Sequence, residues 1–352
     1  MSSFWFFIAF MVEYIYMKFN WDIVGNANII EYLQKNLANQ QLAHGYLFCG
    51  PEQVGKTKTA RAFMASILCE NYQANKKGVV PCGECYHCQQ LAKGIHPDVF
   101  WIEREEDKKN ISIEQINELR NKLGMSSFLN SYKIAVIEGA EKMSLAAANA
   151  LLKTLEEPSK KTIIILITAR LSFLPATIVS RTQIIRFKPV ATIEIMNYLV
   201  GLESDRQQVE VAANLAAGRP GLAINLIEDS DLLAFYQERV KGFLRIKGGD
   251  ISQRFKEIGL LINKKDSFTN KSDNLIVVLD IWLSVLRDLF LIKCFSVDLI
   301  KNVFIQSELE KLANQYSFMQ LKKLIADTRQ TQMYLKQNAN QQLAMENLVI
   351  NF

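Results

Sequence analysis

Eight residues, GPEQVGKT at positions 50–57, have the types and spacing needed to bind phosphate groups. They fit the pattern G-x4-G-K-[ST] and directly follow an apolar run at 45–49. Glycines let successive backbone N–H groups turn toward phosphate oxygens, and the positive end of a following helix adds to their effect. Lys56 would neutralise the β and γ phosphates, and the Thr57 hydroxyl would hold magnesium. The sequence therefore predicts a nucleotide-binding loop, and an ordinary glycine turn is the alternative. The predicted loop residues are Gly50, Pro51, Glu52, Gln53, Val54, Gly55, Lys56 and Thr57.

Four cysteines have a spacing typical of a metal site. Cys82, Cys85 and Cys88 lie in the frame CGECYHC, and Cys69 ends the helix expected after the phosphate loop. Four thiolates surround zinc in closed structural sites, so we expect the ion to hold together a module at about 69–90. His87 is an alternative ligand within the frame. Disulfides are disfavoured because the chain shows no secretory signal.

The two remaining cysteines, Cys49 and Cys294, are expected to be inert core residues.

A second group of polar residues follows the strands expected beside the loop. In phosphate-loop ATPases, one strand ends in an aspartate that orients the metal and a glutamate that activates water. Here KIAVIEGAEKMS places Glu138 at the metal position and Gly139 where the second carboxylate would stand. Glu141 is expected to lie past the strand end and to point elsewhere. Thr168 ends the run IIILIT, where it either contacts a γ phosphate or simply closes a buried strand.

Arg181 lies in the sequence SRT, between LPATIV and the last expected strand. An arginine in an exposed turn at a sheet edge is usually solvated. Its guanidinium is also the group that neutralises a transferring phosphate when a neighbouring subunit supplies it. Both interpretations are open at this point.

The rest of the chain indicates the elements that must position these residues. Apolar and β-branched runs predict strands, which alternate with amphipathic helices, and this alternation is typical of an α/β fold with a parallel sheet. Glu114 is expected to be a capping acid near the start of one of these helices. After Pro189, three short helical segments cover 192–229, and the pattern is helical from Leu232 onward. The expected strands are 45–49, 99–102, 133–137, 163–168 and 183–187, and the expected helices of this half are 26–39, 58–69, 112–123 and 144–155.

Length and composition limit the organisation. With 352 residues, 49% of them hydrophobic and 22% charged, two or three globular domains are expected. The net charge of +5 permits nucleic-acid contact but does not argue for it. The predicted domains are a phosphate-loop domain at 17–190, a helical lid at 191–230 and a helical domain at 231–352.

Two apolar stretches raise the question of a membrane. Residues 1–16, MSSFWFFIAFMVEYIY, are too short to span a bilayer comfortably and have no basic start. We expect a non-core N-terminal extension there, with a membrane anchor as the alternative. The stretch 275–295 contains Asp280, Arg287 and Asp288, so we expect a buried bundle helix.

Taken together, these motifs resemble the bacterial clamp-loader family of AAA+ ATPases. The matching text runs from LAHGYLFCGPEQVGKT through the cysteine frame, HPDVFWIE at 96–103 and NALLKTLEEP at 149–158 to LPATIVSRT at 174–182. The resemblance is good from about residue 21 to 189 and thinner afterwards. It implies an AAA+ domain, a small lid and a helical collar through which subunits form a ring.

The resemblance also implies roles for residues. The family's zinc ligands map onto Cys69, Cys82, Cys85 and Cys88, and its trans-acting arginine finger maps onto Arg181. Two departures separate this chain from the ATP-hydrolysing gamma/tau branch, namely Gly139 at the second carboxylate and Gly221 where that branch senses nucleotide with an arginine. Both departures favour the delta prime branch. The complete phosphate loop is the feature that many members of that branch lack, so ATP binding stays open.

The resemblance thus implies a cytoplasmic delta prime-type subunit of DNA polymerase III with weak or absent ATPase activity of its own. Its expected partners are gamma/tau and delta subunits, the sliding clamp and, through the assembled complex, primed DNA. A gamma/tau-type motor subunit is the alternative. A zinc-dependent DNA-binding module is a third interpretation. It is disfavoured because the residues that flank the cysteines do not form the basic and aromatic pattern that would track a nucleic-acid strand.

Overall fold

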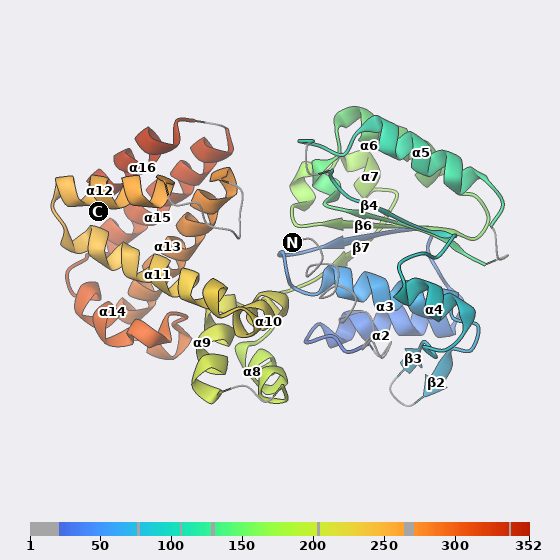
Figure 1. The fold of residues 1–352 in the computed structure, drawn as a ribbon, viewed down its shortest axis with the longest axis horizontal. Helices are drawn as coiled ribbons and strands as arrows, with labels where there is room; N and C mark the ends of the chain where they lie inside the picture. The colour runs from blue at the N-terminus through green and yellow to red at the C-terminus, as the bar shows by residue number, and fades with distance from the viewer. Residues whose placement is uncertain are drawn as a thin grey trace, which may run out of the picture. The chain divides into compact units, whose positions relative to one another are not determined.

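A computed structural model of the chain describes residues 21–75, 78–105, 108–127, 131–202, 205–263, 271–337 and 339–352. The predicted extension at 1–16 lies outside these residues. The chain divides into two compact units (Figure 1). The first contains the residues up to Glu194 together with Arg219–Gly221, and the second contains Ile195–Gly218 and Leu222–Phe352.

The first unit is built on a five-stranded sheet whose neighbouring strands are all parallel, in the order β4-β5-β6-β1-β7. This confirms the expected α/β class with a parallel sheet, and each predicted strand lies within one residue of its observed bounds. The strands are β1 (Gly45–Cys49), β4 (Val99–Ile102), β5 (Lys133–Glu138), β6 (Thr162–Thr168) and β7 (Gln183–Arg186).

The sequence of the central strands explains their position. Every residue of β1 and β6 is buried, as expected for strands covered by helices on both faces. In the sheet register, Cys49 of β1 is paired with Thr168 of β6, and Glu138 of β5 with Ile167. Because parallel strands end at the same edge, the last residues of β1, β5 and β6 come together there. Ligands of open α/β sheets bind at this edge.

Helices cover the two faces of the sheet (Figure 1). Helices α5 (Ile113–Gly124), α6 (Leu145–Glu156) and α7 (Ala176–Val179) share one apolar core with the strands. Helices α2 (Ala27–Ala38) and α3 (Lys56–Leu68) lie on the other side, as Figure 1 shows.

The first turn of α5 contains the predicted acid, Glu114, and also a pair of capping residues that the prediction did not include. Ser112 and Gln115 form a reciprocal capping box, in which each side chain accepts from the other residue's backbone N–H. Glu114 is an exposed residue of the first turn and makes no part of that box. The serine and glutamine at this spacing satisfy two backbone donors at once, and a single acidic side chain does not.

The second unit is helical among its described residues. It holds α9 (Arg206–Ala216) and most of α8 (Thr192–Val200) and of α10 (Pro220–Glu228), where three short helices were predicted. The later helices are α11 (Ser230–Gly248), α12 (Ile251–Asn263), α13 (Lys271–Lys293), α14 (Gln306–Ala313), α15 (Phe318–Lys336) and α16 (Gln341–Ile350). Contacts place 195–218 in one unit with 222–352, and a separate lid at 191–230 stays a prediction.

Helix α13 lies in the core of this second unit. Trp282 is fully buried and packs edge-on against Phe243 and Phe352, with ring centroids 6.0 and 5.7 Å apart. None of the helices in the described part of the chain is both long and apolar enough to cross a membrane.

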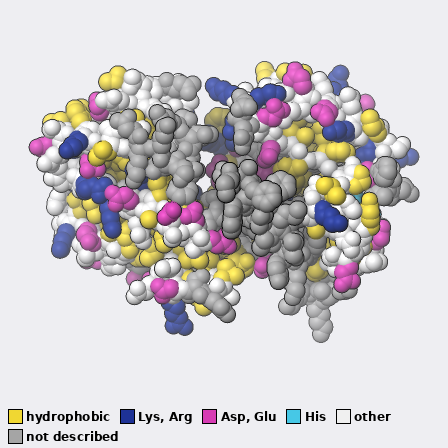
Figure 2. Space-filling model, viewed as in Figure 1, with side chains coloured by type: hydrophobic (Ala, Val, Ile, Leu, Met, Phe, Trp, Pro, Cys, Tyr) yellow, Lys and Arg dark blue, Asp and Glu magenta, His cyan; other side chains and the backbone are white. Residues whose placement is uncertain are grey.

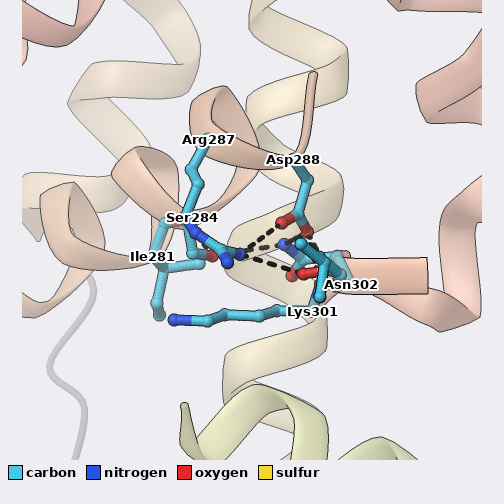
Figure 3. A network of polar contacts seen from close by, with 7 residues as sticks. Ile281, Ser284, Arg287, Asp288, Lys301 and Asn302 are labelled. Atoms are coloured by element: carbon cyan, nitrogen blue, oxygen red, sulfur yellow. Dashed lines mark hydrogen bonds and ion pairs between the residues drawn. The ribbon is translucent and has the colours of Figure 1, made fainter. Parts of the chain in front are cut away.

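A buried carboxylate on α13 holds the following loop in place (Figure 3). Asp288 Oδ2 accepts hydrogen bonds from the backbone N–H groups of Lys301 and Asn302, at 2.9 and 2.8 Å, and from the Asn302 side-chain amide at 2.7 Å. The Arg287 guanidinium lies 3.2 Å from the other oxygen of Asp288. Burial raises the pKa of Asp288, whereas these donors favour its charged form.

Candidate functional site

The phosphate-loop candidate connects β1 to α3, as the sequence predicts. Gly50 has φ 148° and Gly55 has φ 105°, both in the region that side chains avoid. A Cβ at Gly50 would lie 2.4 Å from the Phe187 carbonyl oxygen, so only glycine fits there. The loop therefore has the tight backbone path that phosphate binding requires, and it ends at the start of a helix.

Lys56 points back into the curve of this loop. Its side chain is 6% exposed, and Nζ donates to the carbonyl oxygens of Gly50 and Pro51 at 2.7 and 2.5 Å. Burial lowers the pKa of Lys56, while the carboxylates of Glu52, Glu141 and Glu138 act in the opposite direction. The ammonium group thus contacts the backbone of the loop, and a bound phosphate would replace the two carbonyl oxygens as its partner.

The carboxylate of Glu138 lies beside Thr57, as a magnesium site in a phosphate-loop protein requires. Thr57 Oγ1 donates to Glu138 Oε1 at 2.7 Å. The other oxygen, Oε2, accepts from the indole Nε1 of Trp101 at 3.2 Å. Since magnesium prefers hydroxyl, carboxylate and phosphate oxygens, this pair of side chains fits the ion.

The contact of Trp101 with Glu138 was not predicted from the sequence. Trp101 lies on β4, paired with Val136 of the neighbouring strand, two residues before Glu138. The pairing of β4 with β5 places it there, and the local pattern HPDVFWIE gives no sign of that pairing.

Glu141 contradicts the prediction that it points away from the site. Gly139 has φ 67° and is followed by the short 3-10 helix η1 (Ala140–Lys142), so the chain turns back on itself. Glu141 Oε1 then accepts from the backbone N–H of Ala169 at 3.2 Å, directly after Thr168. Among the described residues, Glu141 Oε2 is buried without a hydrogen-bond partner. No carboxylate stands at position 139, but one lies close to the end of β6.

Thr168 is 1% exposed, and its hydroxyl oxygen accepts from the backbone N–H of Arg170 at 3.0 Å. The structure thus brings the phosphate loop, Glu138, Glu141 and Thr168 to one edge of the sheet.

Gly221, which also belongs to the first unit, contacts the phosphate loop. Its N–H donates to the Gln53 carbonyl oxygen at 2.9 Å. A Cβ at position 221 would lie 3.1 Å from that same oxygen. A larger residue here would force the loop to shift, so the contact suits glycine.

The four predicted metal ligands come together outside the sheet. Cys69 follows α3, and Cys82, Cys85 and Cys88 surround the start of α4 (Tyr86–Ala92), with all four Sγ atoms within 4.8 Å of one another. Two Sγ atoms already accept backbone N–H groups, Cys69 from Cys82 at 3.2 Å and Cys82 from Cys85 at 3.3 Å. The cluster could hold a metal ion.

The protonation of these sulfurs bears on metal binding. Burial raises the pKa of Cys88. Burial also disfavours the thiolate of Cys82, but backbone donors from Glu84 and Cys85 outweigh it and lower the pKa of Cys82 to about 7. A cation in the cluster would have to displace protons, as zinc does in such sites.

His87 is not a member of the cluster. Its Nδ1 lies 2.7 Å from His96 Nε2, and its Nε2 lies 3.3 Å from a carboxylate oxygen of Glu70. Both ring nitrogens therefore have contacts other than a metal. Cys294, expected in the core, is exposed and follows the end of α13, whereas Cys49 is buried as expected.

Arg181 lies at the opposite edge of the sheet from the phosphate loop. It follows α7 and directly precedes Thr182 and β7, and its carbonyl oxygen lies beside Gly45 at the start of β1. The five residues of β1 separate this edge from Gly50, a distance of about 15 Å. The guanidinium is held by Glu156 Oε1 at 2.7 Å and by the Thr177 carbonyl oxygen at 3.1 Å. Arg181 therefore cannot serve the phosphate loop of its own chain.

Comparison of the sequence with known proteins identifies relatives of this chain. Residues 25–191 match the family described as DNA polymerase III, delta subunit. The chain is 33% identical over 215 residues to DNA polymerase III subunit tau of Bacillus subtilis, which covers 59% of this chain and 37% of that protein. It is 43% identical over 141 residues to subunit delta' of Pseudomonas aeruginosa, covering 40% and 42%. With subunit delta' of Bacillus subtilis it shares 30% identity over 187 residues, covering 53% and 55%.

Residues 25–191 therefore form a domain of the DNA polymerase III clamp-loader family. The chain spans between about a third and just over half of the length of these relatives. Relatives of both delta' and tau type match it, so the comparisons give the family and not the branch.

Proposed function

We propose that this chain is a delta prime-type subunit of the bacterial DNA polymerase III clamp loader. It helps to place the sliding clamp on primed DNA as one member of a ring with gamma/tau and delta subunits, in the cytoplasm. Within that ring, Arg181 completes the ATP site of a neighbouring subunit. The observation that carries this proposal is the position of Arg181, which is partly exposed at the sheet edge opposite to its own phosphate loop and cannot reach that loop.

Two glycines support the delta prime branch. Gly139 replaces the carboxylate that activates water in a motor subunit, and its φ of 67° suits glycine. Gly221 stands where a motor subunit senses nucleotide with an arginine, and it packs on the Gln53 carbonyl oxygen. The chain would thus lack two groups that hydrolysis uses in the motor branch.

The cofactors follow from the two sites. Cys69, Cys82, Cys85 and Cys88 hold a structural zinc with no open position for catalysis. The loop at 50–57, with Glu138 and Thr168, binds ATP with magnesium but turns it over slowly. When bound, the magnesium ion supplies charge neutralisation for the phosphates. Lys56 supports it from the loop, and Thr57 and Glu138 orient oxygen ligands toward it.

Contact with primed DNA is assigned to the assembled complex. On the face shown in Figure 2, lysine and arginine side chains are interspersed with aspartate and glutamate and form no continuous basic band over the described residues. The described residues of that face therefore give no sign of a basic track for a single strand.

Co-expression with the tau and delta subunits of the same organism tests the proposal. We expect the three chains to co-purify as one complex that loads the sliding clamp onto primed circular DNA, and we expect loading to fail without this chain. A complex that assembles and loads clamps equally well in its absence would contradict the assignment.

A gamma/tau-type motor subunit is the second candidate, and one observation favours it. The Glu141 carboxylate lies beside Ala169 at the end of β6, close to the site where water would be activated. Steady ATP turnover by the isolated chain that disappears in Lys56→Ala would establish the motor. Turnover that survives Lys56→Ala would come from a contaminant and not from this loop.

A further inference from the structure

We propose that Trp101 is a positioning residue for the metal-side carboxylate of the nucleotide site. Its indole N–H fixes Glu138 in the orientation that binds the magnesium ion of a nucleoside triphosphate. The inference rests on the nucleotide site of the proposed function and adds a residue to it that lies outside the phosphate-loop motif.

The indole is fixed from two sides. Its Nε1 donates to Glu138 Oε2 at 3.2 Å, and the guanidinium of Arg61 lies over the ring, 5.1 Å from its centroid. Arg61 belongs to α3, the helix that begins at Lys56 of the phosphate loop. Trp101 therefore connects the loop helix to the strand that ends in Glu138.

The length of the Glu138 side chain explains why a second donor matters. Phosphate-loop ATPases usually place an aspartate here, and glutamate has one more rotatable bond. A longer side chain loses more rotamer freedom when it is held in one place. Thr57 fixes one carboxylate oxygen at 2.7 Å and Trp101 fixes the other. With one donor on each oxygen, the carboxylate is held in a single orientation.

This orientation has a direct consequence for the metal. While Thr57 donates its proton to Glu138, the lone pairs of its hydroxyl oxygen are free to face a cation. If Glu138 rotated away, Thr57 would lose that acceptor and its own orientation. Residues that orient metal ligands in this way typically change metal affinity about 10- to 100-fold when they are replaced.

The test compares two tryptophan variants of the full chain. Trp101→Phe keeps an aromatic ring under Arg61 and removes the N–H donor together with the rest of the indole. Trp21→Phe is the matched control, because Trp21 is a buried tryptophan of the same unit whose Nε1 donates to Ser66 Oγ at 3.0 Å, away from Glu138. For each protein, the binding of a fluorescent, non-hydrolysable ATP analogue is measured across a magnesium titration and in excess EDTA.

We expect Trp101→Phe to raise the magnesium concentration for half-maximal binding about 10-fold. Binding in EDTA should be unchanged, because the donor acts only through the metal ligand. Trp21→Phe should match the parent in both conditions. When Glu138 is already replaced by alanine, Trp101→Phe should raise the magnesium concentration for half-maximal binding by less than a further factor of about two. The two residues act through one contact, so their effects should not add. Adding magnesium to the parent with unlabelled nucleotide should change its tryptophan fluorescence, and the change should be missing in Trp101→Phe.

A magnesium titration of Trp101→Phe that coincides with that of the parent would overturn the inference while leaving the nucleotide site intact. An equal additional loss in the Glu138→Ala background would also overturn it, since Trp101 would then act by some other route. If the parent binds no nucleotide with or without magnesium, the nucleotide site and this inference both fail. Co-purification with tau and delta subunits still tests the clamp-loader assignment separately.

Discussion

Removing the zinc proposed for the cysteine cluster is expected to destabilise the first unit by a measurable amount. A zinc ion with Zn–S bonds of about 2.3 Å places its four sulfurs about 3.8 Å apart. The Sγ atoms all lie within 4.8 Å of one another, and those of Cys82 and Cys88 are 4.0 Å apart. The cluster thus needs to contract by less than about 1 Å to close around the ion.

The size of the effect follows from ligand linkage. At free zinc about 1,000 times its Kd, binding adds about 4.1 kcal/mol to the free energy of unfolding. For a unit of about 150–250 residues, each kcal/mol shifts Tm by about 2–4 °C, so chelation should lower Tm by about 8–16 °C. The shift should shrink as pH falls, because protons compete for the sulfurs and burial already raises the pKa of Cys88.

The assay is zinc content and thermal unfolding on the same preparation, before and after chelation. Cys88→Ser should lose the zinc and most of the Tm shift, because Cys88 is a buried member of the cluster. Cys294→Ser is the control, because Cys294 is exposed and lies outside the cluster. About one zinc per parent chain is expected. A parent without zinc, or a Cys88→Ser protein that retains it, would refute the reasoning.

Three further changes test other parts of the account. Asp288→Ala removes the acceptor of three N–H groups in the second unit. It should lower the free energy of unfolding, measured in urea, by about 3–5 kcal/mol. The control Asp298→Ala, at an exposed position, should lower it by about 0.5 kcal/mol or less. An equal loss in both variants would argue against the buried network. Glu156→Gln removes the carboxylate that holds Arg181. If Arg181 acts in a neighbour's site as proposed, this change should lower the half-saturating ATP concentration of the assembled complex by up to about fivefold, whereas Glu157→Gln should not. No difference between these two would show that the pair does not restrain the arginine. Lys56→Ala should abolish ATP binding by equilibrium dialysis, and retained binding would place the nucleotide elsewhere.

Sequence patterns predicted the sheet well because its strands are short, apolar and bounded by polar turns. The run TIIILIT of β6 is buried throughout, and such a run has few alternatives to a central strand. The phosphate loop was equally predictable, since its glycines are fixed by the backbone path. The four cysteines also came together as their spacing indicated.

Side-chain contacts between distant segments were not predictable from one sequence. The hydrogen bond between Trp101 and Glu138 depends on which strands are neighbours, and the ion pair of Arg181 with Glu156 depends on how α6 lies beside α7. Glu141 was expected to point away, because the tight turn at Gly139 was not recognised as a reversal. Each of these depends on tertiary geometry that residue types and spacing do not encode.

The central claim is that this chain contributes Arg181 to a neighbour's ATP site. Its most direct test is the DNA-stimulated ATPase of the reconstituted complex carrying Arg181→Ala, with Arg120→Ala as the control because Arg120 contacts only Asn117 of its own helix in the hydrogen bonds described. We predict that Arg181→Ala assembles normally and hydrolyses ATP markedly more slowly, while Arg120→Ala keeps the parent rate. A full rate of hydrolysis by the intact Arg181→Ala complex would contradict the claim.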